Sequence, residues 1–175
     1  MLRHPTQPEP RCIYLLQNDL FVPLFRVKLG VRQFLHLQQS LPRLQPMQAA
    51  AKVMKEQGSG KIINLASVAG AVGDLGISSY TASKAAVINL TRSLALEWVR
   101  YGIQVNAMGP AYIETEMNRV ELSNPKVREK IVGKTPMNRL GVADELAGVA
   151  ILLASDASNY MTGQTVFVDG GWLAQ

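Results

Sequence analysis

The sequence predicts an α/β fold in which a parallel sheet is covered by helices on both faces. Segments typical of helices alternate with short apolar segments typical of strands from about residue 46 to the end of the chain. Glycines follow these segments, as they do where helices and strands stop. Apolar residues make up 47% and charged residues 18% of the 175 residues, a composition typical of a folded domain.

The first expected elements are a helix and a strand. Residues 46–57 are rich in alanine and other helix formers, and Gly58 and Gly60 provide a stop. Residues 61–67 (KIINLAS) are apolar and rich in isoleucine, which favours a short buried strand. A glycine-spaced loop follows over residues 68–76.

A long helix is predicted over about residues 79–101. Ser78 or Ser79 is the expected cap, and Gly102 is the expected stop. Residues 103–108 (IQVNAM) are then predicted to form the next strand.

The C-terminal part repeats the alternation. A loop is expected to open at Gly109 and Pro110. A helix is expected over residues 142–155, with its acidic residues in the first turn, where the helix dipole favours them. Residues 164–171 (QTVFVDGG) are predicted to form the last strand, closed by a glycine turn.

The first 45 residues differ from the rest, so we divide the chain into residues 1–45 and 46–175. The first part is predicted to be irregular or poorly ordered, with prolines at five positions. Its apolar run, residues 13–27, is interrupted by Pro23 and is compatible with either a short strand or a helical turn. The second part is expected to be one domain.

Charge and composition exclude several function classes. The net charge is +5, but residues 1–45 carry six basic and two acidic residues, so residues 46–175 are nearly neutral. This predicts no nucleic-acid partner. No run of 18 apolar residues is present, so no membrane span is expected. The single cysteine, Cys12, rules out an intrachain disulfide framework and a cysteine-based metal site.

These features favour a cytoplasmic protein. A basic, acid-poor N-terminal segment is also typical of a mitochondrial transit peptide, but five prolines and a single serine argue against that interpretation.

Tyr80 and Lys84 are a candidate proton-transfer pair. Residues four apart lie on the same face of a helix, and an ammonium group beside a phenol favours the phenolate form. Such a tyrosine can exchange a proton with an alcohol or carbonyl oxygen. The spacing alone is a weak motif, and a polar patch on an ordinary helix explains it equally well.

Ser67 strengthens the catalytic interpretation of this pair. It follows an apolar strand, and ligands bind at the carboxyl ends of strands in open parallel sheets. A hydroxyl group at that position can donate to a developing oxyanion. The alternative is a serine that only forms a turn.

From about residue 47 to 175 the chain resembles the C-terminal half of a classical short-chain dehydrogenase/reductase. The motifs that carry the resemblance are GKIINLASVAG, YTASK, VNAMGPAYIETEM and TGQTVFVDGG, in that order. Ser67 precedes Tyr80 by the 13 positions that this family favours. The resemblance implies a partial doubly wound, Rossmann-like sheet with flanking helices and with the first half of the fold missing.

The resemblance also implies roles for individual residues. Tyr80 is the expected general acid/base, Lys84 its partner and a ligand of the nicotinamide ribose, and Ser67 a donor to the substrate oxygen. The implied cofactor is NAD or NADP, held at Tyr80, Lys84, Pro110, Ile113 and Thr115. The implied substrate is a small secondary alcohol or its carbonyl form, such as a sugar acid or a cyclic or fatty-acyl alcohol.

Two further positions in the VNAMGPAYIETEM motif draw attention. Asn106 matches a residue that braces the strand near the site. Ala111 replaces the usual glycine, which predicts a cost of about 1 kcal/mol if φ is positive at this residue.

The glycine-rich turn that binds the cofactor pyrophosphate in this family is not found. The glycines at 58 and 60 precede a strand, and Gly70, Gly73 and Gly76 lie between the expected strand of Ser67 and the helix of Tyr80. The asparagine that completes the family's site, expected near residues 38–40, is absent as well. Truncation, a shifted reading frame and an alternative start explain this pattern equally well.

Two functions are therefore predicted. The first is an oxidoreductase of this family. The second is a catalytically inactive, truncated fragment that keeps only the oligomerisation surface. The helix over residues 79–101 carries two stripes of apolar and small residues, one suited to the sheet and one to another subunit, so a homo-oligomer through this helix is expected. Burial of both stripes within one domain is the alternative.

Overall fold

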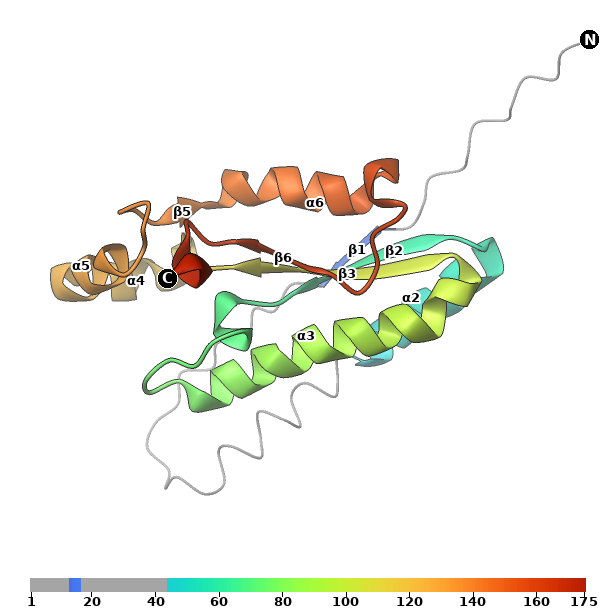
Figure 1. The fold of residues 1–175 in the computed structure, drawn as a ribbon, viewed down its shortest axis with the longest axis horizontal. Coiled ribbons are helices and arrows are strands. Elements are labelled where there is room, and N and C mark those ends of the chain that lie inside the picture. The colour runs from blue at the N-terminus through green and yellow to red at the C-terminus, as the bar shows by residue number, and fades with distance from the viewer. Residues whose placement is uncertain (1–12, 17–43) are drawn as a thin grey trace, which may run out of the picture.

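The computed structural model of the chain describes residues 13–16 and 44–175. In this part of the chain, four strands form one parallel sheet in the order β1-β2-β3-β6 (Figure 1). The strands are β1 (Ile13–Leu16), β2 (Gly60–Leu65), β3 (Ile103–Pro110) and β6 (Thr165–Val168). The predicted parallel sheet is confirmed.

Helices cover both faces of the sheet, as predicted. α2 (Leu44–Gln57) and α3 (Ser78–Trp98) lie on one face, and α6 (Ala147–Ala154) lies on the other (Figure 1). Successive residues of β2 point to opposite faces. Ile62 therefore packs in the cluster that contains Leu94 of α3, whereas Ile63 packs against Leu153 of α6.

The long central helix follows the prediction at its C-terminus but not at its N-terminus. After α3, a short 3-10 turn, Val99–Tyr101, ends at Gly102, whose φ of 74° is the left-handed conformation expected of a helix stop. Neither Ser78 nor Ser79 caps the helix. Ile77 occupies the cap position and makes no side-chain capping bond, so the predicted serine cap is wrong.

Two other element boundaries differ from the predicted ones. β3 runs on through Pro110, because β6 pairs with it up to that residue, so no loop opens at Gly109. Proline is tolerated there because it ends the strand. The helix predicted over residues 142–155 begins as a 3-10 turn, Ala143–Leu146, and becomes α6 only at Ala147.

Strand β1 comes from the segment that was expected to be irregular. Of the two alternatives for residues 13–27, Ile13–Leu16 is a strand, and it pairs in parallel with β2 from Lys61 to Asn64. The rest of residues 1–43, including Cys12, lies outside the described residues. The edge of β2 is thus paired over four residues by the chain itself.

A second, smaller unit, which was not predicted, comes between β3 and α6 in the sequence. It consists of the two-stranded parallel sheet β4 (Ile113–Glu114) and β5 (Gly141–Val142) and of the helices α4 (Arg119–Leu122) and α5 (Pro125–Gly133). This unit and the C-terminus lie at one end of the main sheet (Figure 1).

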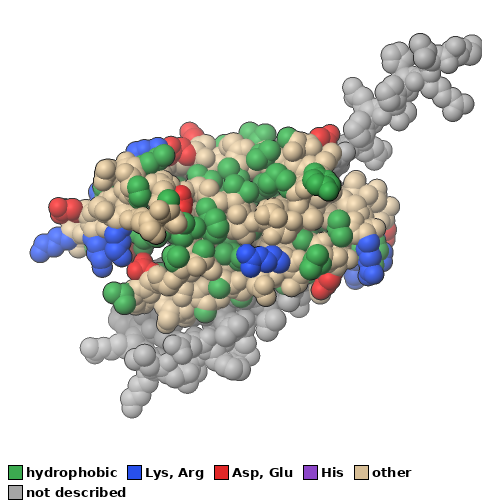
Figure 2. Space-filling model, in the orientation of Figure 1, with side chains coloured by type: hydrophobic (Ala, Val, Ile, Leu, Met, Phe, Trp, Pro, Cys, Tyr) green, Lys and Arg blue, Asp and Glu red, His purple; other side chains and the backbone are tan. Residues whose placement is uncertain are grey.

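Hydrophobic side chains lie exposed over α6 (Figure 2). Ile151 is 67% exposed, whereas Leu153 on the opposite side of the helix is buried. Within residues 13–16 and 44–175, no helix combines the length and hydrophobicity that crossing a bilayer requires. In the same part of the chain, no cluster of three histidine, cysteine or acidic residues is arranged to hold a metal ion.

Candidate active site

Ser67 connects the ends of two neighbouring strands. It follows β2 in an extended conformation and caps the short 3-10 helix η2 (Val68–Gly70) by accepting the Ala69 N–H at 3.2 Å. Its hydroxyl group donates to the carbonyl oxygen of Pro110, at the end of β3, over 3.5 Å. The side chain is buried, so its hydroxyl is oriented by backbone groups on both sides.

Lys84 lies on the buried face of α3 and reaches the same end of the sheet. Only 6% of the residue is exposed, and its Nζ donates to the carbonyl oxygen of Leu65, the last residue of β2, at 2.9 Å. The same Nζ lies 5.6 Å from the centre of the Tyr80 ring, and Tyr80 is 43% exposed. The pair therefore combines a buried cation with a solvent-accessible phenol on one helix face.

Ala111 carries no strained backbone. Among the described residues, Asn138 is the one non-glycine residue with a positive φ, at 52°. The penalty expected if φ were positive at Ala111 therefore does not apply. Its N–H donates to Val168 of β6 at 3.1 Å, so the strand pairing holds this residue in place.

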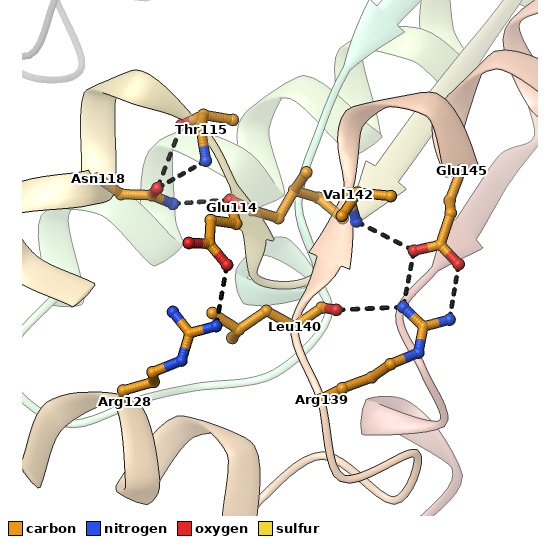
Figure 3. Close-up of polar contacts among 9 residues, drawn as sticks. Glu114, Thr115, Asn118, Arg128, Arg139, Leu140, Val142 and Glu145 are labelled. Carbon is orange, nitrogen blue, oxygen red and sulfur yellow. Dashed lines mark hydrogen bonds and ion pairs between the residues drawn. The ribbon is translucent and has the colours of Figure 1, made fainter. Parts of the chain in front are cut away.

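Ile113 and Thr115 are fixed by Asn118 (Figure 3). Asn118 Oδ1 accepts the Thr115 N–H at 2.8 Å and the Thr115 hydroxyl at 3.2 Å, while its Nδ2 donates to the Ile113 carbonyl at 2.7 Å. The bend after β4 is therefore closed by one side chain. Asn118 was not recognised in the sequence, although together with Thr115 it forms a capping box around residues 115–118.

A bidentate ion pair joins the residues just before and just after β5 (Figure 3). Arg139 donates to both oxygens of Glu145, at 2.6 and 2.8 Å, and Glu145 Oε2 also accepts the Val142 N–H at 3.0 Å. The hydrogen bonds from Arg139 and from the Val142 backbone lower the pKa of Glu145 to about 2. The pair is exposed and acts mainly as a geometric clamp.

A cavity of about 370 Å³ opens beside this clamp. Ala111, Tyr112 and Ile113 line it, together with Arg139 and the turn that follows β6. Ser67, Tyr80 and Lys84 do not line it. The cavity therefore borders the segment predicted to hold the nicotinamide, but it does not contain the three predicted catalytic residues.

Asn106 has a structural role. Its Nδ2 donates to the Met161 carbonyl at 2.9 Å and its Oδ1 accepts the Gln164 N–H at 3.0 Å, so it ties β3 to the loop before β6. Both amide groups are used within the fold, and the side chain is buried.

Tyr112 was missed in the sequence. Its ring centre lies 5.4 Å from that of Trp172, near the C-terminus, at a tilt of 50°. Burial raises the pKa of Tyr112, and the nearby Asp74, Glu121 and Tyr80 raise it further. The feature of the sequence that could have drawn attention to Tyr112 is its position directly after Gly109, Pro110 and Ala111.

Four of the predicted residues thus form two contacting pairs, Ser67 with Pro110 and Lys84 with Tyr80. Ser67 contacts Pro110, and Lys84 contacts both the end of β2 and the ring of Tyr80. Ile113 and Thr115 lie on the next segment, beyond Ala111.

Known proteins resemble this chain over most of its described residues. The family model described as enoyl-(acyl carrier protein) reductase matches residues 43–173. The 2-dehydro-3-deoxy-D-gluconate 5-dehydrogenase of Bacillus subtilis is 45% identical over 128 residues, which cover 73% of this chain and 50% of that protein. The gluconate 5-dehydrogenase of Gluconobacter oxydans is 41% identical over 71% of this chain and 48% of its own length.

A solved structure matches a similar share of this chain. The crystal structure of a gluconate 5-dehydrogenase from Burkholderia cenocepacia, in complex with NADP and tartrate, is 44% identical with a TM-score of 0.71. The match covers 73% of this chain and 50% of that one. The chain spans about half the length of the curated relatives it matches, so the fold is a partial one.

Proposed function

We propose an oxidoreductase function for this chain, which belongs to the short-chain dehydrogenase/reductase family. The reaction interconverts a secondary alcohol and its ketone, with NAD or NADP as the hydride carrier. The names of the relatives, gluconate 5-dehydrogenase among them, support a sugar acid as the substrate.

The observation that supports this proposal is that Ser67 and Lys84 both donate to carbonyl groups at the carboxyl ends of β2 and β3, with the ring of Tyr80 beside Lys84. Lys84 Nζ lies 2.9 Å from the Leu65 carbonyl and 5.6 Å from the Tyr80 ring, and Ser67 Oγ lies 3.5 Å from the Pro110 carbonyl. Ligands bind at this edge of open parallel sheets.

Each of the three residues has a separate task. The phenol of Tyr80 gives a proton to the carbonyl oxygen or takes one from the alcohol, and its exposure leaves it accessible to substrate. The ammonium of Lys84 favours the phenolate form electrostatically. The hydroxyl of Ser67 donates to the substrate oxygen and exchanges its long bond to Pro110 for a better one.

The residues present fit the nicotinamide end of the cofactor. A buried ammonium beside an exposed phenol provides donors for ribose hydroxyl groups, and Pro110, Ile113 and Thr115 lie on a backbone segment held rigid by Asn118. The fit does not extend to the pyrophosphate, because the glycine-rich turn that binds it in this family is not found in the sequence. When bound, the cofactor supplies the hydride chemistry.

The proposal is tested by following reduced nicotinamide absorbance with D-gluconate and a panel of other secondary alcohols. Tyr80→Phe is expected to lower kcat by about 100-fold or more, because general acid–base catalysis is lost. Tyr160→Phe is the matched control, since Tyr160 is fully exposed on the surface. Absence of activity in the wild-type chain with every alcohol, or equal activity in Tyr80→Phe, contradicts the proposal.

A second candidate function is a non-catalytic fragment that keeps an oligomerisation surface. The pairing of β1 with β2 favours it, because this pairing makes a four-stranded sheet whose described elements do not include the family's pyrophosphate-binding turn. In both cases we propose a homo-oligomer formed through the 79–101 helix, α3 with its 3-10 extension. Leu96 on α3 is 80% exposed, and Ala82 and Ala85 on the same helix are exposed as well.

A further inference from the structure

Two segments that flank the candidate site meet at a half-exposed ion pair. Asp74 lies in the loop just before α3, six residues ahead of Tyr80, and Lys134 follows the end of α5. The Lys134 Nζ is 3.6 Å from Asp74 Oδ1, and the side chains are 48% and 27% exposed. A cation from the small unit thus faces the loop that leads into the helix of Tyr80.

Aromatic rings connect this cation to the site. The Lys134 ammonium lies 5.9 Å from the centre of the Trp172 ring, which packs on Tyr112. Tyr112 in turn follows Ala111 on the segment predicted to hold the nicotinamide. Asp74, Lys134, Trp172 and Tyr112 therefore form a continuous series of contacts, which starts in the loop that leads into the helix of Tyr80.

The ammonium of Lys134 is held loosely. Its contact with Asp74 is long, whereas Arg139 makes two bonds of 2.6 and 2.8 Å to Glu145. Exposed pairs of this kind contribute little to stability. Asp74 Oδ1 also accepts the Leu75 N–H at 2.8 Å, so the carboxylate keeps a partner if the ammonium leaves.

The main chain at Lys134, by contrast, is fixed. Its N–H donates to the Ile131 carbonyl at 3.2 Å, and its carbonyl oxygen accepts a bond from Gln175 Nε2 at 2.8 Å. A rigid backbone carrying a loosely paired cation suits binding of an anionic ligand, because little ordering is needed when the partner is exchanged.

We propose that Lys134 binds the carboxylate of a sugar-acid substrate whose reacting carbon lies at Tyr80. The substrate carboxylate replaces Asp74 as the partner of the ammonium, and Tyr112 and Trp172 form the wall between the two ends of the substrate. Lys134 is therefore a specificity-determining residue that separates acids from uncharged polyols. This inference rests on the proposed oxidoreductase function.

The test compares D-gluconate with D-glucitol, which has a hydroxymethyl group in place of the carboxylate. Dissociation constants are measured by calorimetry on the full 175-residue chain, with and without NADP. The wild-type chain is expected to bind gluconate about tenfold more tightly than glucitol, the usual size of a net charge-assisted hydrogen bond. Lys134→Met removes this preference, and Lys134→Arg keeps it.

Two further variants sharpen the test. Lys130→Met, one helical turn earlier on α5, is the matched control and keeps the preference, because Lys130 is exposed and outside this series of contacts. Asp74→Asn is expected to tighten gluconate binding several-fold, since it removes the internal competitor of the substrate carboxylate.

The inference is overturned if the wild-type chain binds the two ligands equally or binds neither, or if Lys134→Met weakens both by the same factor. Failure of the proposed function is distinguishable from this result, because binding is read without turnover. If the chain prefers gluconate over glucitol through Lys134 but transfers no hydride, the oxidoreductase function is refuted and the carboxylate site is not. If the wild-type chain turns over gluconate and glucitol with equal kcat/KM, the carboxylate site at Lys134 is refuted and the oxidoreductase function is not.

Discussion

Lys84 shows how a costly buried charge is supported in this fold. An ammonium group taken out of water must be hydrogen-bonded, and Lys84, at 6% exposure, bonds the Leu65 carbonyl at 2.9 Å. This carbonyl belongs to the last residue of β2, directly before Ala66 and Ser67. The position of this cation is thus set by the end of a strand, which is why it lies beside Ser67.

Glu145 provides a pH test at the residue scale. The hydrogen bonds from Arg139 and the Val142 N–H lower its pKa from 4.5 to about 2 in the folded chain. The stabilising contribution of a carboxyl group with a lowered pKa is complete above the unfolded value and is lost as the pH falls through the folded value.

We therefore expect the stability difference between the wild type and Glu145→Gln to be constant above about pH 5 and to shrink between pH 4.5 and 2. Thermal melts of both proteins over this pH range measure the difference. Glu129→Gln, an exposed carboxylate on α5, is the control and should show a much smaller change. A difference that is independent of pH down to pH 2 would contradict the assignment.

At the element scale, the contact between η2 and α3 fixes Ser67 relative to Tyr80 and Lys84. Gly70 ends η2, and a Cβ placed on it would lie 2.6 Å from the backbone carbonyl carbon of Lys84. Two of the glycines that do not fit a dinucleotide motif thus have a structural explanation. Gly70 allows close packing on α3, and Gly76 allows a turn with a φ of 79°.

Gly70→Ala is expected to push η2 away from α3. We expect a loss of about 1–3 kcal/mol in the free energy of unfolding, together with reduced activity. Gly73→Ala is the matched control in the same loop, because nothing lies within 4 Å of its added Cβ and its φ is not positive. Urea denaturation and the nicotinamide assay measure both effects, and equal behaviour of the two variants would refute this packing argument.

The elements that were predicted correctly have signals within a few residues. Gly102 takes the left-handed conformation that ends the long helix, and the isoleucines of β2 form a buried strand. Elements that depend on distant partners were missed. The two-residue strands β4 and β5 pair with each other across the intervening helices α4 and α5, and no periodicity can appear over two residues. α5 could have been predicted, because Asn124 before Pro125 is a helix start.

The candidate site likewise contains residues with a local sequence signal and residues that only the fold brings together. Ser67, Tyr80 and Lys84 could be proposed from the sequence because their spacing is local and matches a family pattern. The series of contacts among Asp74, Lys134, Tyr112 and Trp172 brings together segments up to about 100 residues apart, which only the fold can do.

At the scale of the whole molecule, the expected oligomer through α3 is open to test. Leu96 is 80% exposed on this helix, so Leu96→Glu should disrupt a subunit contact without disturbing the core. Light scattering is expected to show an oligomer for the wild type and a smaller species for the variant. Leu75→Glu, at a loop residue that is 92% exposed, is the control and should leave the mass unchanged. A monomeric wild type, or a Leu96→Glu variant of unchanged mass, would contradict the proposed interface.

The most direct test of the central claim, a site that uses NAD or NADP, is a calorimetric titration of the 175-residue chain with NADH and NADPH. A dissociation constant in the micromolar range is expected for at least one of them, weakened about tenfold or more by Lys84→Met but not by Lys130→Met. Absence of binding heat for both nucleotides at millimolar concentration, with the wild-type chain folded, would show that this chain is not a nicotinamide-dependent oxidoreductase.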